Sequence, residues 1–345
     1  MIKILFLSDT HLGHEYPIRA TKRIRRGQDF FDNFEFVLNY AIEHKIDLIL
    51  HGGDFFFRTK IPEAIIGKSY KILYDFAKHN IPLVIVPGNH ESSRLPRSPL
   101  IFQPNLHIFK EACCFHFEIK GKKINISGFP YERHQIRDQF HDIAQQIKKQ
   151  EAEADINLLL THHAVEGCTC GPGNYTFRKN EDVIQMKDIP MHYDAVLCGH
   201  IHREQILWKN EQNKKLPIIY AGSVERTSFA EKEEIKGFYV LEFDGKKQNR
   251  NFVPLNTRPM VDISIPENLN SAIDLVNYLL DESKSLDSRS ILKIKCTNEE
   301  IRKLLTPKLL DEVFKPSIIT QISGWNQEFK QRKKKEKTPN LFDLM

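Results

Sequence analysis

Short runs of apolar, often β-branched residues recur along the chain and predict buried strands at residues 2–7, 46–50, 83–86, 158–161 and 195–198. Between the first three runs, apolar residues instead repeat at helical spacing, which predicts helices at about residues 30–42 and 65–76. Strand, helix, strand, helix, strand in this order is typical of βαβ units. The pattern therefore favours an α/β fold with a buried parallel sheet.

The middle of the chain adds more strands. Residues 106–127 are strand-like around a turn at Gly121 and Lys122, residues 132–152 read as a polar helix, and further strands lie between residues 205 and 252. The sequence at 256–259, Asn-Thr-Arg-Pro, reads as a linker because proline and the residue before it disfavour regular structure. We therefore expect a first domain over residues 1–255.

A smaller α+β domain is predicted over residues 256–324. Its pattern is strand (260–265), helix (269–280), strand (291–296), helix (299–313) and strand (318–322). Residues 325–345 are predicted to form a basic, disordered tail, because charge dominates there until a few apolar residues at the end.

The composition indicates an ordinary globular protein. Hydrophobic residues make up 41%, charged residues 28%, and the mean hydropathy is −0.43. The apolar run at 2–7 is shorter than the core of a secretion signal and no cleavage site follows it. Six cysteines without such a signal indicate reduced thiols and a cytoplasmic location. The pair Cys168 and Cys170 has no partner pair at zinc-site spacing, which favours ordinary thiols.

The positive charge of the chain is local. The net charge is +5, and residues 330–337 alone carry that excess. A polyanion would therefore be attracted by local patches and not by a field of the whole protein. One candidate DNA-binding patch, for which a solvated loop is the alternative, comprises Arg19, Lys22, Arg23, Arg25 and Arg26.

Side chains of the kinds that bind metals follow five of the predicted strands. They are Asp9, His11, Asp54, Asn89, His162, His200 and His202. The carboxyl ends of strands in an open parallel sheet meet at one edge, so we expect these side chains to converge. Nitrogen and oxygen donors without sulfur suit manganese, iron or zinc better than calcium. With one shared carboxylate, the set suffices for two metal ions.

This ordered set resembles that of the calcineurin-like metallophosphoesterases. The resemblance rests on Asp9-x-His11, Gly53-Asp54, Gly88-Asn89-His90-Glu91, His162 and Gly199-His200-x-His202. Within that superfamily the chain resembles the SbcD-like DNA repair exonucleases, bacterial relatives of the meiotic-recombination nuclease, through residues 26–30, 171–178, 199–205 and 222–226. The match covers about residues 1–255. It implies a β-sandwich flanked by helices (αββα), with a small capping domain that is similar only in element order.

The resemblance also implies roles for individual residues. One metal would be held by Asp9, His11 and His202, the other by Asn89, His162 and His200, with Asp54 between them. His90 would be the catalytic acid. The implied cofactors are two divalent cations, with Mn²⁺ preferred over iron or zinc. Some members of the family have a histidine where this chain has Phe57, and His163 stands beside His162, so only one of that pair is expected to bind metal.

The implied function is a two-metal phosphodiesterase that acts on DNA ends as an exonuclease. Endonuclease activity is a further expectation. One alternative is a calcineurin-like phosphoesterase acting on a small nucleotide or another phosphodiester. A second is a non-catalytic scaffold of the same fold, which the retention of every ligand and of His90 disfavours.

The resemblance implies DNA, a second copy of the chain and an SbcC-like coiled-coil ATPase as partners. Tyr175 and Arg178 lie in a loop that could stack on or clamp a nucleic-acid strand, and an ordinary surface loop is the alternative. In the tail, Leu341, Phe342 and Leu344 could dock in a groove of a partner.

Overall fold

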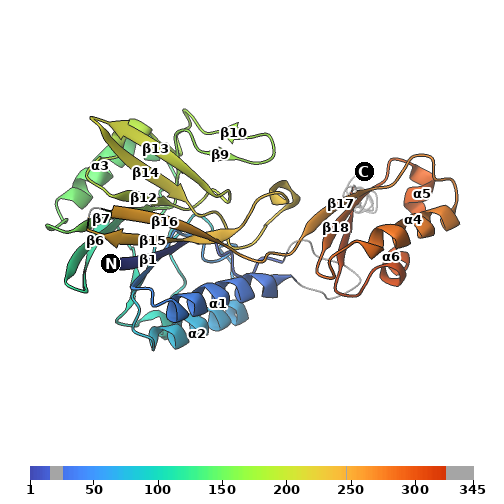
Figure 1. Ribbon diagram of the computed structural model, residues 1–345, viewed down its shortest axis with the longest axis horizontal. Helices are drawn as coiled ribbons and strands as arrows, with labels where there is room; N and C mark the ends of the chain where they lie inside the picture. The colour runs from blue at the N-terminus through green and yellow to red at the C-terminus, as the bar shows by residue number, and fades with distance from the viewer. Residues whose placement is uncertain (16–25, 246, 324–345) are drawn as a thin grey trace, which may run out of the picture. The chain divides into compact units, whose positions relative to one another are not determined.

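The computed structural model describes residues 1–15, 26–245 and 247–323. These residues fall into two compact units that meet in sequence at Thr257 and Arg258 (Figure 1). That boundary lies within the segment 256–259 that reads as a linker.

One six-stranded sheet of the first unit has the order β16-β15-β1-β2-β3-β4. Its strands are β1 (Ile2–Leu7), β2 (Leu48–His51), β3 (Leu83–Ile85), β4 (Leu106–Ile108), β15 (Gly237–Asp244) and β16 (Lys247–Pro254). β1 to β4 run parallel, and β15 pairs antiparallel with β1. The helices α1 (Gly27–Glu43) and α2 (Glu63–Ala77) connect β1 to β2 and β2 to β3, which confirms the predicted βαβ units (Figure 1).

The second six-stranded sheet has the order β13-β14-β12-β7-β6-β5. Its strands are β5 (Cys113–Ile119), β6 (Lys122–Gly128), β7 (Ile156–Thr161), β12 (Ala195–Cys198), β13 (Gln205–Glu211) and β14 (Lys214–Tyr220). The central strands are parallel, and an antiparallel hairpin closes each edge. The helix α3 (Ile136–Lys148) follows β6.

Shorter elements complete the first unit. They are β8 (Ala164–Val165), β9 (Thr169–Cys170), β10 (Tyr175–Thr176), β11 (Val183–Ile184), and the 3₁₀ helices η1 (Pro99–Ile101), η2 (Met186–Asp188) and η3 (Phe229–Glu231). β9 and β10 form an antiparallel hairpin.

The alternation of side chains along the strands explains the layers. In β1, Ile4 and Phe6 point into a core shared with Leu158 and Leu160 of the second sheet, whereas Leu5 faces the opposite way. Leu5 belongs to a core built with the apolar faces of α1 and α2, and a third core packs α3 against the outer face of the second sheet. The four layers are helix, sheet, sheet and helix, so the predicted α/β fold is confirmed.

The second unit contains a three-stranded parallel sheet in the order β17-β18-β19. Its elements are β17 (Met260–Ser264), α4 (Ala272–Lys284), β18 (Ile291–Lys295), α5 (Glu299–Leu304), α6 (Pro307–Val313) and β19 (Ile319–Ile322). The prediction of a single helix over residues 299–313 is wrong, because two helices, α5 and α6, occupy this segment. Pro307 cannot continue a helix from the preceding turn, and the Thr306 hydroxyl instead accepts a hydrogen bond from the Leu309 amide at 3.2 Å and caps α6.

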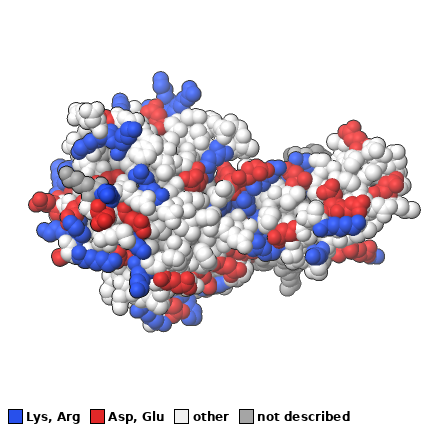
Figure 2. Space-filling view, in the orientation of Figure 1, with Lys and Arg blue, Asp and Glu red and all other residues white. Residues whose placement is uncertain are grey.

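Charges of both signs are interspersed over the face of the molecule seen in Figure 2. Among the described residues, no helix is long and apolar enough to cross a membrane.

Candidate metal centre

The loops that follow β1 and β2 are joined by backbone hydrogen bonds, and this brings their polar side chains together. The Asp9 amide donates to the Gly53 carbonyl at 2.9 Å, and the His11 amide donates to the Asp54 carbonyl at 3.0 Å. Asp9, His11 and Asp54 are all buried. The convergence expected for residues at the carboxyl ends of neighbouring parallel strands is therefore built into the backbone.

A first group of donor atoms comes from Asp9, His11 and His202. Nε2 of His11 lies 2.9 Å from Nε2 of His202, and the two nitrogens lie 3.9 and 3.8 Å from Oδ1 of Asp9. All three ligand atoms lie within 4.8 Å of one another. They come from the loops after β1 and β12, so the two sheets build this group together.

A second group of donors is centred on Asn89. Its Oδ1 lies 3.0 Å from Nε2 of His162 and 3.0 Å from Nδ1 of His200. Oδ1 of Asp54 lies 3.3 Å from the same His162 nitrogen, while Oδ2 of Asp54 lies 4.0 Å from Nε2 of His11. Asp54 thus faces both groups, one with each carboxylate oxygen.

Several residues of these loops have positive φ angles. The residues with positive φ include Asp9 (52°), His11 (45°), Asp54 (49°) and His200 (78°). Non-glycine residues rarely adopt this left-handed region, and such strain is concentrated at functional sites. Gly88 serves the same packing, because a Cβ there would overlap the carboxylate of Asp54.

Further polar groups orient the histidines. Nδ1 of His162 donates to the Gly52 carbonyl at 2.7 Å, and Nδ1 of His202 donates to Oε1 of Glu231 at 3.0 Å. Each bond leaves the other ring nitrogen facing the cluster, as metal-binding histidines require. Sequence reasoning missed Glu231, because it lies on η3, outside every motif that follows a strand.

Glu91 belongs to a quoted motif but had no assigned role. Its carboxylate accepts hydrogen bonds from the amides of Phe56 at 2.5 Å and Gly88 at 2.8 Å, and so it ties together the loops that carry Asp54 and Asn89. Burial and the neighbouring Asp54 raise the pKa of Glu91 to about 8.

The histidines of the cluster differ in protonation. Burial lowers the pKa of His11, and it lowers that of His200 to about 3, so both rings are neutral ligands at pH 7. Burial also disfavours charge on His162, but Asp54 outweighs it and raises the pKa of His162 to about 9. In the metal-free protein a proton on His162 therefore balances Asp54, and a bound cation would replace it.

The residues present fit two divalent cations. Imidazole nitrogens, carboxylate oxygens and one amide oxygen form the donor set, and no thiolate takes part. Asp9, His11 and His202 would hold one ion and Asn89, His162 and His200 the other, with Asp54 facing both.

His90 differs from the other histidines in its exposure. Its side chain is 33% exposed, against 1% for that of His11, and its Nε2 lies 3.7 Å from Oδ2 of Asp54. Nδ1 of His90 donates to the carbonyl of Phe57. Phe57 therefore supplies a backbone acceptor to His90, and its ring centroid lies 4.0 Å from that of His14.

His163 turns away from the cluster. Its ring stacks on Tyr131 at a centroid distance of 4.8 Å, and its Nε2 accepts a hydrogen bond from the Glu132 amide at 3.0 Å. Of the adjacent pair, the structure brings only His162 to Asp54 and Asn89.

The structure describes only some of the residues that were expected to bind DNA. Arg26 requires a correction: its side chain is fully buried and its guanidinium lies 2.9 Å from the Glu225 carboxylate, so it cannot meet a phosphate. The other four residues of that patch, Arg19, Lys22, Arg23 and Arg25, lie outside the described residues.

Tyr175 and Arg178 are exposed, at and just beyond the β9–β10 hairpin. Arg203, next to His202, donates to the Gly171 carbonyl at 2.6 Å and to Oδ1 of Asn174 at 2.7 Å. The hairpin is thereby fixed to the segment that carries a candidate metal ligand.

The chain is similar to known proteins in sequence and in fold. Residues 2–204 match the family described as calcineurin-like phosphoesterase. The chain is 24% identical over 328 residues to the DNA double-strand break repair protein Mre11 of Saccharolobus solfataricus, covering 90% of this chain and 79% of that protein. It is 22% identical over 350 residues to the Mre11 protein of Thermoplasma acidophilum, covering 98% and 84%. A solved dimetal phosphatase from Danio rerio is similar with a TM-score of 0.44 and 10% identity, covering 73% of this chain and 95% of that one.

Proposed function

Because this chain belongs to the calcineurin-like phosphoesterase family, we propose that it is a two-metal nuclease that hydrolyses phosphodiester bonds at DNA ends. The observation that carries the proposal is the pair of donor groups that share Asp54, with the partly exposed His90 beside them. Metal-dependent hydrolysis follows from the family and the donor set, and DNA as the substrate is the proposed step.

The residues of the site would have separate roles in hydrolysis. Two bound divalent cations would lower the pKa of a water and stabilise charge on the attacking and leaving oxygens of an in-line displacement. His90, held through Nδ1 by the Phe57 carbonyl, presents Nε2 for donation of a proton to the departing oxygen. Glu91 and Gly52 keep the ligand loops in register. We propose Mn²⁺ as the cation, since nitrogen and oxygen donors suit it.

Similarity to two archaeal double-strand break repair proteins over most of their length supports DNA as the substrate. Exposed Tyr175 and Arg178, on a segment anchored by Arg203 beside His202, suit contact with a strand. We also propose a homodimer, an SbcC-like ATPase as partner and a cytoplasmic location, with the tail beyond Trp325 as the ATPase-binding segment. Deletion from Asn326 onward should abolish capture of such a partner and leave manganese-dependent nuclease activity intact.

The decisive experiment is digestion of end-labelled duplex and single-stranded DNA with Mn²⁺, Mg²⁺ or EDTA, beside hydrolysis of a chromogenic phosphodiester. Cleavage from the labelled ends with Mn²⁺, absent in EDTA and in His90→Ala, is the expected result. Hydrolysis of the chromogenic diester without any cleavage of DNA would instead support the alternative of a small-molecule phosphoesterase.

A further inference from the structure

Two buried polar side chains, Thr10 and His51, connect the loop after β1 to the loop after β2. Neither is exposed to solvent, and neither is a candidate metal ligand. Oγ1 of Thr10 lies 3.0 Å from Nε2 of His51 and donates to the carbonyl of Phe55 at 3.0 Å. Nδ1 of His51 accepts a hydrogen bond from the Gly53 amide at 3.2 Å. Three side-chain hydrogen bonds therefore join the two loops.

The directions of these bonds fix the tautomer of His51. Because Nδ1 accepts from a backbone amide, which can only donate, the proton of the neutral ring is on Nε2. Nε2 therefore donates to Oγ1 of Thr10, whose own proton goes to the Phe55 carbonyl. Every polar atom of the two side chains has a partner, so the imidazole and the hydroxyl act together as one link.

The link holds the backbone from which candidate metal ligands project. Thr10 stands between Asp9 and His11, which both have positive φ, 52° and 45°. Such conformations persist only where the surrounding structure over-determines them. In the facing loop, the Gly53 peptide donates to His51 and accepts a hydrogen bond from the Asp9 amide at 2.9 Å. A shift of either loop would therefore move the other.

The backbone that His51 holds is packed against another candidate ligand. A Cβ at Gly53 would overlap the ring of His162, and a Cβ at Gly52 would overlap the side chain of Ser8. Asp54 follows Gly53 directly and faces both donor groups. A displacement of this segment would therefore reach the carboxylate of Asp54 and the ring of His162 together.

We propose that Thr10 and His51 are positioning residues that set the spacing of the two metal-binding groups, so that Asp54 faces both. The inference rests on the two-metal site of the proposed function and not on DNA as the substrate. The alternative is a polar pair that only stabilises the core. The two roles differ in what happens to metal binding in a variant that stays folded.

The first test measures Mn²⁺ binding to the full chain by isothermal titration, and the EPR spectrum of the manganese-loaded protein. Thr10→Val removes the hydroxyl and keeps the branched shape of the side chain. It should weaken Mn²⁺ binding by about 10- to 100-fold and replace the spectrum of an exchange-coupled pair with that of isolated ions. Thr10→Ser keeps the hydroxyl and should restore both the affinity and the coupled spectrum.

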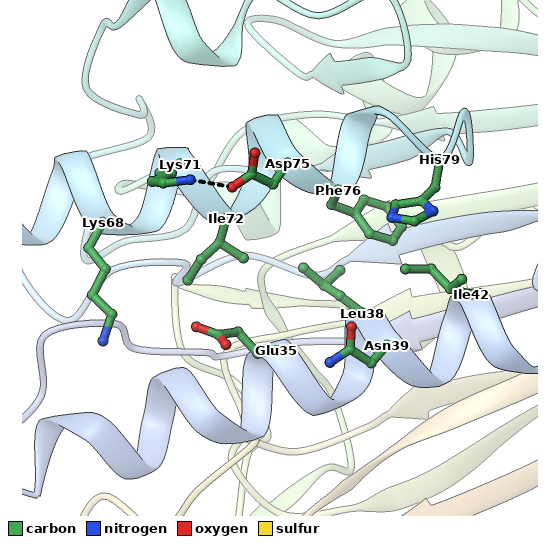
Figure 3. A pocket seen from close by; sticks show the side chains of 10 residues that line it. All are labelled: Glu35, Leu38, Asn39, Ile42, Lys68, Lys71, Ile72, Asp75, Phe76 and His79. Carbon is green, nitrogen blue, oxygen red and sulfur yellow. Dashed lines mark hydrogen bonds and ion pairs between the residues drawn. The ribbon is translucent and has the colours of Figure 1, made fainter.

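The second test separates the two hydrogen bonds of the His51 ring. In His51→Gln the new amide nitrogen can take the place of Nε2 and donate to Thr10, whereas in His51→Asn the new oxygen takes the place of Nδ1 and reaches only Gly53. Mn²⁺ affinity should therefore stay closer to that of the wild type in His51→Gln than in His51→Asn. The control is His79→Gln, because His79 is exposed and lines the groove between α1 and α2 (Figure 3). Its Mn²⁺ affinity should be unchanged.

Thermal unfolding of each metal-free variant distinguishes positioning from stabilisation. A lower Tm in Thr10→Val with wild-type affinity and a coupled spectrum would assign the pair to the core alone and overturn the proposal. If Thr10→Val does not fold, the two His51 variants decide, and equal Mn²⁺ affinity in them would overturn it. A wild-type chain that binds no Mn²⁺ would refute the two-metal site of the proposed function itself.

Discussion

Nδ1 of His202 lies 3.0 Å from Oε1 of Glu231, and the other oxygen of that carboxylate lies 2.7 Å from the ammonium of Lys236. Lys236 is fully buried and also donates to the carbonyl of His202 at 2.8 Å. One ion pair therefore fixes both the ring and the backbone of a candidate metal ligand.

This relationship predicts that Glu231 supports metal binding by orienting the ring of His202. Glu231→Gln should weaken Mn²⁺ binding at one of the two sites by about 10- to 100-fold, because the ring loses its charged acceptor. Glu233→Gln is the control, since that side chain is 86% exposed. Isothermal titration should show two unequal sites in Glu231→Gln and wild-type behaviour in Glu233→Gln. Equal affinities in the two variants would contradict the role.

His90 should be needed for chemistry and not for metal binding. His90→Ala should reduce hydrolysis of a chromogenic phosphodiester by about 10²- to 10⁴-fold, the range of general acid catalysis. His90 Nε2 lies close enough to His11 and Asp54 to join a metal site, but each proposed site keeps its other donors without this ring. The metal content of His90→Ala, by elemental analysis, should therefore stay near that of the wild type. Loss of both metals would show that the assignment of His90 is wrong.

Asp54 should matter to both metal sites. Asp54→Ala should abolish activity and lower occupancy of both, because its two oxygens face different donor groups. His11→Ala should lower occupancy of one site. The comparison is made by elemental analysis and manganese titration, and identical occupancy in the two variants would exclude a shared carboxylate.

The basic segment gives a prediction about DNA binding. Arg23→Ala/Arg25→Ala should weaken duplex binding and reduce its salt slope by roughly 0.9 for each phosphate that is no longer neutralised. Cleavage of the chromogenic diester should persist. Arg26 is left in place because it pairs with Glu225 in the core. A salt slope equal to that of the wild type would indicate a solvated loop.

Glu151 should stabilise the first unit in a pH-dependent way. Its carboxylate is 2% exposed and accepts hydrogen bonds from Ser127, His192 and Lys148 at 2.8 to 3.0 Å. Burial alone would raise the pKa of Glu151, but His192, Lys148 and Ser127 outweigh it and hold the pKa below the usual 4.5. The stabilisation is therefore present above about pH 4.5 and is lost as the pH falls further.

The measurement is urea unfolding of Glu151→Gln as a function of pH. At pH 7 the free energy of unfolding should fall by about 1–3 kcal/mol, and the difference from wild type should shrink below pH 4.5. The exposed Glu153→Gln serves as the control. A difference that is constant down to pH 2 would contradict the linkage.

The sequence by itself determined the long central strands, the crossover helices and the polar residues that follow these strands. A buried strand must be apolar, whereas the loop at its carboxyl end can be polar. Each strand with its loop therefore forms a local sequence pattern, an apolar run followed by polar residues. The run at 2–7 followed by Asp9 and His11 is such a pattern, and β1 has those bounds in the structure.

Only the tertiary structure decided which groups orient the candidate metal ligands and which basic side chains are accessible to solvent. Glu231 reaches His202, and Glu225 buries Arg26, through pairings between residues far apart in sequence. Such partners have no local signature, because burial depends on what the rest of the chain packs against a side chain. The pairing of β15 with β1 and the turning away of His163 were decided in the same way, by packing between sheets and loops that no single segment encodes.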